Sequence, residues 1–388
     1  MINQISINNF KSIVDMSLPL GRVNVLIGPN GCGKSNILEA IAFASAAAQD
    51  RLDYEYLVNR DVRMSDPEFM VNAFVDDDDQ ITKKDGASDL IQIEVIDDLH
   101  PCLCNIKFNQ HLKRWVNYSK ILSENLTFLK DESDLTESQR EKLASLANQL
   151  EALGLKKDDL LNSLLDVLAT TSLLSEFLTY RPTEHFLRKT FETSILPLGV
   201  HGEGLMKYLK EKAQEKDQEF FKEINSGLEL LDWFDGFKIP DDLLSNEYRL
   251  SIGDKYLKDS LHFFDQRSTN EGFLFLLFYL TLFNSKDTPG FFAIDNIESA
   301  LNPRLITKLM GYLIDRCFVN DKQVIVTTHS PYVLDALDLS NDDVRLFVVR
   351  RDIDGHTRIE RIPYRENRTM PLSQLWMSGL IGGLPDNF

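Results

Sequence analysis

Apolar and polar positions in the first third of the chain follow the short periods that strands favour. Residues 3–10 and 13–20 alternate well enough to form two paired strands. Residues 23–28 (VNVLIG) form a mainly apolar run that leads into a glycine-rich loop and then into the helix-prone segment 36–48. Acidic or Gly/Ser-containing turns separate three further predicted strands, at residues 70–75, 91–96 and 103–109. The pattern predicts a strand-rich region that contains one strand–loop–helix unit.

The middle of the chain, roughly residues 120–180, is rich in Leu, Lys, Glu and Gln and predicts helices. Four leucines recur with 3-4-3 spacing and place one apolar stripe on a helix: Leu143, Leu146, Leu150 and Leu153. Gly154 interrupts the stripe, and a second leucine-rich segment follows. Each arm of this helical hairpin would be about 25–30 Å long at about 1.5 Å per residue. We therefore predict a packing or partner-docking insertion rather than a long coiled coil.

The last third alternates between apolar strands and helices. Residues 271–283 form a strongly apolar helix, and residues 291–295 (FFAID) form a buried strand. The remaining predicted elements are helices at 302–317 and 331–337 and strands at 323–329 and 344–350. Strands that alternate with helices predict an α/β core with a mainly parallel sheet.

The loop after residues 23–28 carries the strongest chemical pattern in the chain. Gly28–Ser35 reads G-P-N-G-C-G-K-S, a complete G-x-x-x-x-G-K-[ST] motif. Its glycines let backbone N–H groups turn inward around phosphate oxygens, and the following helix adds its dipole. Lys34 is placed to reach the β- and γ-phosphates, and the Ser35 hydroxyl to bind Mg²⁺. The predicted nucleotide contacts in this motif are Asn30, Gly31, Cys32, Gly33, Lys34, Ser35 and Asn36.

A second candidate ligand ends the buried strand at residues 291–295. Asp295 is the last residue of this strand. A carboxylate at the tip of a strand beside the phosphate loop holds Mg²⁺ through water in P-loop ATPases. We therefore expect ATP and Mg²⁺ as cofactors, with Ser35 and Asp295 as the metal ligands.

Composition narrows the class of protein. The formal net charge of −18 argues against a protein that binds DNA mainly by neutralising its phosphates. Contact with DNA is therefore possible only through a local basic patch or a partner. No apolar run approaches the roughly 18 to 20 residues of a membrane-spanning helix, and the N-terminus lacks the pattern of a signal peptide. The four cysteines do not match zinc-finger spacing. We expect a cytoplasmic protein with reduced cysteines and no membrane contact.

Four motifs together resemble one family. They are N-N-F-K-S-I (8–13), G-P-N-G-C-G-K-S-N (28–36), D-N-I-E-S-A-L-N-P (295–303) and T-T-H-S-P (327–331). The chain resembles the RecF/SMC-related ABC ATPases, and within these the OLD-type and "AAA family ATPase" proteins of bacterial defence loci. The resemblance covers residues 1 to about 350, with a nonmatching helical middle. It implies an α/β ABC-ATPase head, a P-loop NTPase fold with a mixed or mainly parallel sheet, flanking antiparallel strands and a helical hairpin insertion.

The resemblance also implies roles for residues outside the phosphate loop. His329 stands at the position of a histidine that contacts the γ-phosphate, and Ser299–Asn302 resembles the loop that crosses the dimer interface. Lys11 could reach the nucleotide phosphates from the N-terminal strand pair. The glutamine that senses the metal in this superfamily should follow the early strands, and three candidates remain open: Gln80, Gln92 and Gln110.

Residues 268–273 (STNEGF) stand at the place of the signature motif, which caps the ATP of the opposing subunit. Asn270, Glu271 and Gly272 are the implied contacts. Asn270 stands where a serine is common, so either Ser268 or Thr269 could supply the hydroxyl. The match to the signature motif is therefore partial.

One departure from the family pattern concerns catalysis. ABC-type enzymes usually place a glutamate directly after the Mg²⁺ aspartate, but this chain has Asn296 there, and Glu298 is the next acid. An amide can orient water but cannot accept its proton. Either Glu298 takes over, or hydrolysis is slow. Our hypothesis is a slow ATP-gated switch whose catalytic residues are Asp295, Asn296, Glu298 and His329.

Two functions follow from the resemblance. The first is an ATPase that forms a homodimer through ATP and acts as sensor or regulator of a separate effector, a nuclease or toxin from the same locus, in anti-phage defence. OLD-type relatives carry a TOPRIM nuclease domain after the ATPase, whereas Asp352-Ile353-Asp354-Gly355 is interpreted here as a hairpin turn. The alternative is a RecF/SMC-like DNA-repair or DNA-clamp ATPase. Assembly beyond a dimer stays open.

The motifs divide the chain into four predicted parts. Residues 1–115 form an N-terminal ATPase lobe with the phosphate loop, and residues 116–260 form a mainly helical insertion or lobe. Residues 261–365 form a C-terminal ATPase lobe with the signature-like turn, Asp295 and His329, and residues 366–388 form a tail.

Overall fold

The computed structural model describes residues 1–72, 89–98, 101–119, 172–189, 195, 197–241, 243–244, 247–258, 263–366 and 369–384. The predicted helical hairpin with its leucine stripe, and Gln80, lie outside the described residues. Contacts within the chain define two compact units. The first contains residues 1–21, 30–177 and 349–360, and the second contains residues 22–29, 178–348 and 361–388.

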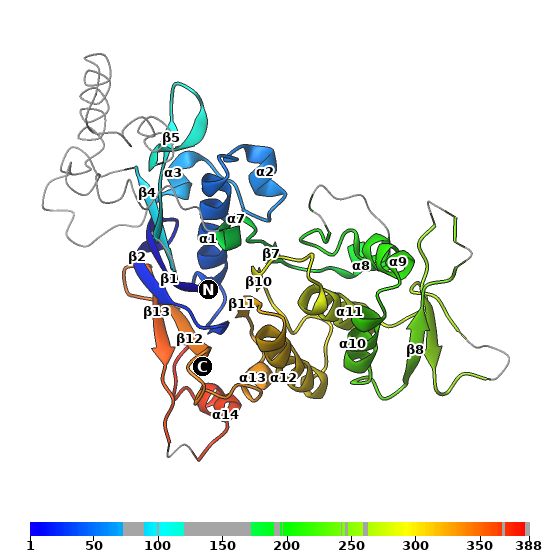
Figure 1. Cartoon of the computed structure of the whole chain (residues 1–388). Coiled ribbons are helices and arrows are strands. Elements are labelled where there is room, and N and C mark those ends of the chain that lie inside the picture. The colour runs from blue at the N-terminus through cyan, green and yellow to red at the C-terminus, as the bar shows by residue number, and fades with distance from the viewer. Residues whose placement is uncertain are drawn as a thin grey trace, which may run out of the picture. The chain divides into compact units, whose positions relative to one another are not determined.

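The first unit is built on an antiparallel sheet with strand order β2-β1-β4-β5-β6 (Figure 1). The strands are β1 (Ile2–Phe10), β2 (Ile13–Pro19), β4 (Ile91–Asp97), β5 (Pro101–Asn109) and β6 (Arg114–Asn117). The predicted pairing of the first two strands is confirmed, with Ser6 opposite Ser17. The predicted strands at 91–96 and 103–109 are confirmed as β4 and β5.

Helix α1 (Lys34–Ala48) packs against this sheet because most of its surface is apolar. Phe43 of α1 lies between two aromatic side chains of the sheet, with ring centroids 5.7 Å from Phe10 and 5.4 Å from Trp115. The helix is also in contact with the short helices α2 (Tyr54–Val58) and α7 (Ser172–Ser175). The strand predicted at 70–75 is wrong at its start, because Met70 belongs to the short helix α3 (Pro67–Met70), which Pro67 begins. Residues 73–75 lie outside the described residues.

The second unit contains a sheet whose strands run parallel from β12 through β3, β11 and β10 to β7. The full strand order is β13-β12-β3-β11-β10-β7. The strands of this sheet are β3 (Val23–Ile27), β7 (Thr179–Tyr180), β10 (Phe291–Ile294), β11 (Gln323–Thr327), β12 (Val344–Arg351) and β13 (Thr357–Ile362), of which the stretch 349–360 is counted with the first unit. Every residue of β3, β10 and β11 is buried, as expected for central strands of a parallel sheet covered on both faces.

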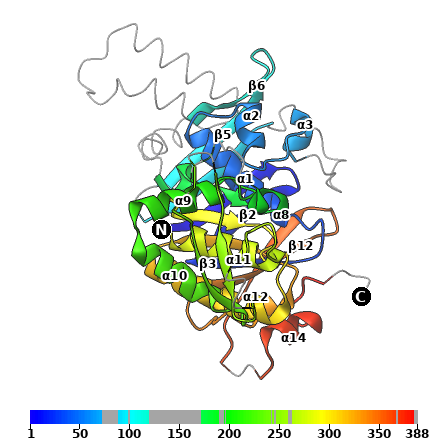
Figure 2. The same ribbon diagram turned by 90° about the vertical axis from the view of Figure 1, so that its right-hand side faces the viewer.

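Helices of the second unit form a shared apolar core with this sheet. They are α8 (Glu184–Arg188), α9 (Leu205–Glu215), α10 (Gln218–Leu228), α11 (Glu271–Asn284), α12 (Pro303–Val319), α13 (Pro331–Leu334) and α14 (Leu372–Met377). Figure 2, in which α9 and α10 face the viewer, shows α11 among them. Helix α11 is apolar on all sides and is buried from Phe273 to Phe283, packed against α8, α10 and α12.

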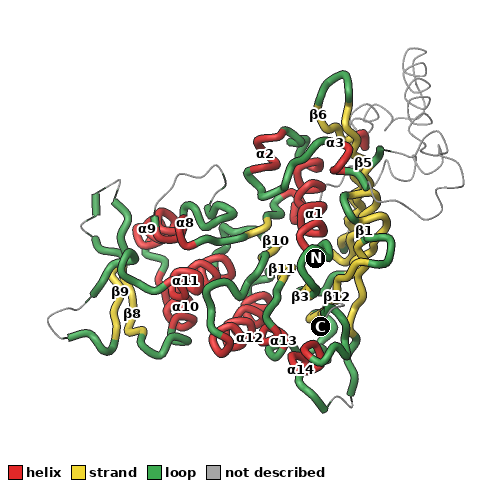
Figure 3. The backbone as a smooth tube through the Cα atoms, turned by 180° about the vertical axis from the view of Figure 1, so that it is seen from behind, coloured by secondary structure: helices red, strands yellow, loops and turns green. Residues whose placement is uncertain are grey.

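The part predicted as mainly helical contains strands as well as helices. A hairpin of β8 (Phe234–Lys238) and β9 (Ser251–Asp254) lies beside α10 and α11 (Figure 3). Trp233 anchors this hairpin through ring contacts with Phe264 and with Phe273 of α11. Strand β7 likewise belongs to the parallel sheet rather than to a helical lobe. A two-residue strand is too short to show a periodic pattern, so the sequence did not predict it.

The C-terminal tail packs on the second unit near the start of the phosphate loop. Leu372 and Trp376 of α14 are buried in the core, and the Trp376 indole N–H donates to the Gly383 carbonyl over 3.3 Å. Gly383 has φ 78°, and a Cβ there would lie 3.1 Å from Val348 Cγ1 and 3.6 Å from Gly28 Cα. The glycine therefore permits the tail to approach the first residue of the loop closely.

Candidate nucleotide-binding site

The phosphate loop begins at the carboxyl end of a central strand. Strand β3 lies between β11 and β12 and runs parallel to both. Parallel strands all end at one edge of a sheet, so Gly28 follows β3 at the edge where Asp295 follows β10 and Thr328 follows β11. This edge is where ligands bind in open α/β sheets. The predicted order of strand, loop and helix is confirmed.

The later part of the loop, in the first unit, presents the amino end of α1. Gly33 is the N-cap with φ 108°, and no side chain caps the helix. The first backbone N–H groups of α1 therefore have no capping side chain, which is the arrangement that binds anions at helix N-termini. Lys34 is only 6% exposed, and its Nζ lies 3.8 Å from Cys32 Sγ. Burial raises the pKa of the Cys32 thiol, and the Lys34 ammonium opposes that shift.

A series of hydrogen-bonded polar side chains supports the phosphate loop. Asn36 Nδ2 donates to Ser12 Oγ over 2.7 Å, the Ser12 and Thr357 hydroxyls lie 2.6 Å apart, and Thr357 Oγ1 donates to the Cys32 carbonyl over 3.0 Å. Thr357 is buried, and a Cβ at Gly33 would lie only 2.1 Å from its Oγ1. No sequence pattern predicted Thr357, because it lies more than 300 residues from the loop that it contacts.

Lys11 makes a different contact from the predicted one. Its ammonium donates to the Glu39 carboxylate on α1 and to the Arg63 carbonyl over 2.8 Å. Arg63 also pairs with Glu39 and donates to Asn36 Oδ1 over 3.0 Å. Burial lowers the pKa of Lys11, and Glu39 opposes that shift. Lys11, predicted to contact nucleotide, thus pairs with a side chain of α1 here, and Asn36, a residue of α1 with the same prediction, contacts Ser12 and Arg63.

Asp295 is a buried carboxylate that contacts side chains at the ends of the two strands on either side of β10. Its side chain is 4% exposed. One oxygen accepts from the Thr327 hydroxyl at the end of β11, and the other pairs with the Arg181 guanidinium at the end of β7. Thr327 Oγ1 in turn accepts from the Asn296 backbone N–H over 2.9 Å. The residues around Asp295 thus come from three adjacent strands of the parallel sheet.

Glu298 links the D-N-I-E-S-A-L-N-P segment (295–303) to the T-T-H-S-P segment (327–331). Its carboxylate accepts from the Thr328 hydroxyl and from the His329 backbone N–H, each over 2.7 Å. The His329 side chain is exposed beyond this anchor. Asn296 has φ 57°, a left-handed conformation that Asn adopts more readily than most residues. Glu298 therefore positions His329, and both of its oxygens already accept hydrogen bonds.

The signature-like turn is a helix N-terminus. Asn270 caps α11, with its Oδ1 accepting from the Phe273 N–H over 2.9 Å. A Cβ at Gly272 would lie 3.2 Å from the Ala300 carbonyl, so the turn and the Ser299–Asn302 loop are in close contact. Ser268 is exposed whereas Thr269 is buried, which favours Ser268 as the hydroxyl of the two that a ligand could meet. Glu271 lies in the first helical turn beside them.

These residues fit Mg-ATP by their chemistry. The uncapped end of α1 suits phosphate, while the buried Asp295 and the Ser35 hydroxyl supply oxygen atoms of the kind that Mg²⁺ prefers. Lys34 supplies a positive charge inside the loop.

Comparison with known proteins decides the family. A sequence model described as "RecF/RecN/SMC N terminal domain" matches residues 1–352. The chain belongs to the RecF/RecN/SMC family. It is a RecF/SMC-type ABC P-loop ATPase with an α/β ABC-ATPase fold, as its motifs predicted.

Two Smc head structures with bound ScpA domains support this fold. A Smc head bound to the C-terminal winged-helix domain of ScpA is 14% identical, with a TM-score of 0.52, and the match covers 93% of this chain and 98% of that one. A Smc head with an extended coiled coil bound to the C-terminal domain of ScpA, derived from Pyrococcus furiosus, is 11% identical, with a TM-score of 0.50 and coverage of 93% and 96%. The SMC head domain from Thermotoga maritima is 15% identical, with a TM-score of 0.46 and coverage of 94% and 99%.

A curated relative links this RecF/SMC-type chain to OLD proteins. A stretch of 41 residues is 44% identical to the OLD nuclease of Thermus scotoductus. The match spans 11% of this chain and 8% of that protein.

The metal-sensing glutamine of this RecF/SMC-type ATPase stays open. Gln92 of β4 donates to Asn105 Oδ1 over 2.9 Å, and Gln110 lies exposed in the turn between β5 and β6. Both belong to the first unit. In the second unit, the side chain that neutralises Asp295 is Arg181, which no sequence motif identified.

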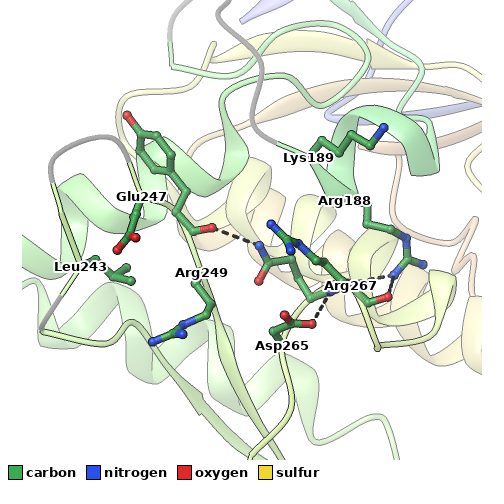
Figure 4. Close-up of a pocket in the computed structure, with 9 residues that line it drawn as sticks. Arg188, Lys189, Leu243, Glu247, Arg249, Asp265 and Arg267 are labelled. Carbon is green, nitrogen blue, oxygen red and sulfur yellow. Dashed lines mark hydrogen bonds between the residues drawn. The ribbon is translucent and has the colours of Figure 1, made fainter.

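A cavity of about 570 Å³ in the second unit lies beside the segment that leads to the signature-like turn (Figure 4). Figure 4 shows Arg188 and Lys189 on one side, Glu247 and Arg249 on the other, and Arg267 between them. Four of its nine lining residues are cationic and two are acidic: Arg188, Lys189, Arg249 and Arg267 against Glu247 and Asp265.

Arg188 also supports that turn. Its guanidinium donates to the carbonyls of Gln266, Arg267 and Thr269 over 2.8, 3.0 and 3.1 Å. These bonds fix the backbone just before Asn270, so Arg188 acts on the signature-like turn through the main chain.

The segment that resembles a nuclease carboxylate pair is a hairpin turn. Asp352 and Asp354 lie between β12 and β13, and Gly355 has φ 82°. Asp352 accepts from the His356 backbone N–H over 2.8 Å and pairs with Arg358 over 2.7 Å. Asp352, Asp354 and His356 lie close enough together to hold a cation, but a carboxylate engaged in this way has the turn-forming role that the sequence predicted.

Among the described residues, no helix is both long enough and apolar enough to span a bilayer.

Proposed function

We propose that the protein binds Mg-ATP, forms a homodimer through it and hydrolyses it slowly, so that the ATP-bound dimer acts as a switch. Two observations near Asp295 carry this proposal. An asparagine, Asn296, follows Asp295 directly, and both carboxylate oxygens of Glu298 already accept hydrogen bonds. The switch would be the sensor or regulator of a separate effector, a nuclease or toxin, in anti-phage defence.

Residues of the phosphate loop and Asp295 would hold the nucleotide and its metal ion. The uncapped end of α1, Lys34 and Ser35 would bind the phosphates and the metal, with Asp295 as the second metal ligand. When bound, Mg²⁺ would neutralise charge on the phosphate oxygens. His329, fixed by its backbone bond to Glu298, would present its exposed ring to the terminal phosphate.

Asn296 and Glu298 would make the hydrolysis of ATP slow. Asn296 can orient a water molecule but cannot take its proton. Glu298 could take the proton only by giving up hydrogen bonds to Thr328 and His329. Both facts support slow turnover, and slow turnover gives a bound state that lasts long enough to signal.

The amino end of α11 would form part of the ATP-dependent dimer interface. Asn270 fixes the amino end of α11, a helix end suited to cap the terminal phosphate of the opposing subunit. The contact between Gly272 and Ala300 joins this turn to the loop that the family resemblance places at the dimer interface. The relation to OLD proteins supports the defence role, with a separate effector as the further part of the proposal.

The experiment is sedimentation with and without Mg-ATP, together with steady-state hydrolysis, using Lys34→Ala as the blank. We expect wild type to dimerise with Mg-ATP, Lys34→Ala to stay monomeric, and turnover to be below about 1 s⁻¹, the low end for enzymes. Turnover clearly above the blank would mean that Glu298 or another group replaces the missing base. Turnover at the blank level, with ATP bound, would mean an ATP-held clamp. A sedimentation pattern that ignores ATP would refute the switch.

The alternative function, a RecF/SMC-like DNA-repair or DNA-clamp ATPase, is favoured by the family and by the cationic cavity. Cations there could contact DNA phosphates despite the overall negative charge. Reversing charge at Lys189 and Arg249 should then lower DNA affinity at least tenfold at low salt. The same reversal at the exposed Lys207 and Lys222 of α9 and α10 is the matched control. Binding that is undetectable in wild type, or equally weakened by both pairs, would reject the DNA clamp.

A further inference from the structure

Arg181 and Asp295 occupy equivalent positions on neighbouring strands. Strand β7 pairs in parallel with β10, with Thr179 opposite Ala293 and Tyr180 opposite Ile294. The next residues are Arg181 and Asp295. The Asp295 N–H donates to the Tyr180 carbonyl over 2.9 Å, and the Arg181 N–H donates to the Val200 carbonyl over 2.7 Å. These bonds tie both backbones to neighbouring segments, so a rearrangement of the two side chains need not move the strands.

The ion pair between these residues compensates a buried charge. The Asp295 side chain is 4% exposed, whereas the Arg181 side chain is 37% exposed. A buried carboxylate is stable only when a cation or hydrogen-bond donors compensate its charge. Here the Thr327 hydroxyl donates a hydrogen bond to one carboxylate oxygen, and the Arg181 guanidinium donates to the other. A divalent cation that binds Asp295 must therefore compete with Arg181.

We propose that Arg181 is a positioning residue that holds the Asp295 carboxylate in the metal-free protein and releases it to Mg²⁺ when Mg-ATP binds. The inference rests on the proposed Mg-ATP site. The guanidinium sits on a long, partly exposed side chain, so it can leave Asp295 without any movement of β7. Once released, its planar N–H groups match phosphate oxygens, the anions that arrive with the metal.

In this arrangement, Arg181 determines how much Mg²⁺ is needed for ATP to bind. With Arg181 present, Mg²⁺ replaces one positive partner of Asp295 by another. With Arg181 removed, Asp295 loses the positive charge of this ion pair, so Mg²⁺ has one competitor fewer and should bind the carboxylate more tightly. For the same reason it should repel metal-free ATP. A purely structural role for Arg181 would weaken both kinds of binding together.

The test uses the full-length protein and a fluorescent ATP analogue, titrated with MgCl₂ and, separately, bound in EDTA. For Arg181→Gln we expect the Mg²⁺ concentration at half-maximal binding to fall about tenfold, and the affinity in EDTA to fall at least fivefold. Arg181→Lys keeps the charge, so its EDTA affinity should stay within about threefold of wild type. The matched control is Arg316→Gln, which removes the ion pair with Glu223 between α12 and α10.

Two further outcomes separate this inference from the proposed function. A Mg²⁺ midpoint for Arg181→Gln equal to or above that of wild type, with an unchanged melting curve, would overturn the role of Arg181. If Arg181→Gln does not fold, Arg181→Lys decides. A fall of at least fivefold in its affinity for ATP in EDTA, although the positive charge is kept, would overturn the role of Arg181. Asp295→Asn binding Mg-ATP as tightly as wild type does would instead refute the metal site itself.

Discussion

Asn296→Glu is expected to raise the rate of ATP hydrolysis about ten- to hundredfold. A positioned general base contributes about 10²–10⁴ in rate. Part of this gain would be lost, because Asn296 has φ 57° and a glutamate there costs about 1 kcal/mol more backbone strain. The bond between the backbone N–H of residue 296 and the Thr327 hydroxyl does not depend on the side chain, so the new carboxylate should stay next to Asp295. Steady-state phosphate release, corrected with Lys34→Ala, measures the change.

The control for this experiment is Asn296→Gln, which has similar size and strain but no proton acceptor. We expect its rate to stay within about threefold of wild type. If Asn296→Glu is no faster than wild type while its melting temperature is unchanged, proton transfer to residue 296 does not limit turnover. Glu298 would then be the candidate base, and Glu298→Gln should abolish the remaining activity.

Gly33→Ala is expected to destabilise the first unit and abolish nucleotide binding. The new Cβ would lie 2.1 Å from Thr357 Oγ1, and the residue has φ 108°. Strain and overpacking together cost about 3 kcal/mol. We expect the melting temperature to fall by about 6–12 °C, because about 1 kcal/mol corresponds to 2–4 °C in a protein unit of 150–250 residues.

Gly31→Ala is the matched control, because Gly31 also has positive φ (77°) but a Cβ there would meet nothing within 4 Å. It should cost about 1–2 kcal/mol, the backbone strain alone. Thr357→Ala should compensate Gly33→Ala, with a coupling free energy of about 1–2 kcal/mol in a double-mutant cycle. Equal effects of the two glycine substitutions, or no coupling to Thr357, would show that the contact is unimportant.

Residues with local sequence patterns could be predicted, and residues that depend on long-range contacts could not. The phosphate loop, the strand that ends at Asp295 and the hairpin turn at Gly355 follow from short motifs and periodicity, and all three are confirmed as elements. Thr357, Arg181 and Arg188 matter through partners between 78 and 325 residues away. No local pattern marks a polar residue whose partner is so distant along the chain.

Asn270 illustrates an intermediate case. The sequence marked it as an imperfect member of a signature-like motif, where a hydroxyl is common. The structure uses it as the N-cap of α11, a position where Asn and Ser are about equally favourable. The physical requirement at this position is therefore a short polar side chain that caps the helix, which a family pattern alone does not express.

Helix α11 has a mechanical consequence for the second unit. It is apolar on all sides and buried from Phe273 to Phe283, so it cannot turn or slide without exposing apolar surface to water. At about 1.5 Å per residue, its 14 residues span about 21 Å. Beyond its carboxyl end Ser285 bonds Tyr208, which together with Lys212 contacts Asp287. A force on the amino end of α11 would therefore be transmitted to that polar cluster rather than absorbed by independent movement of the helix.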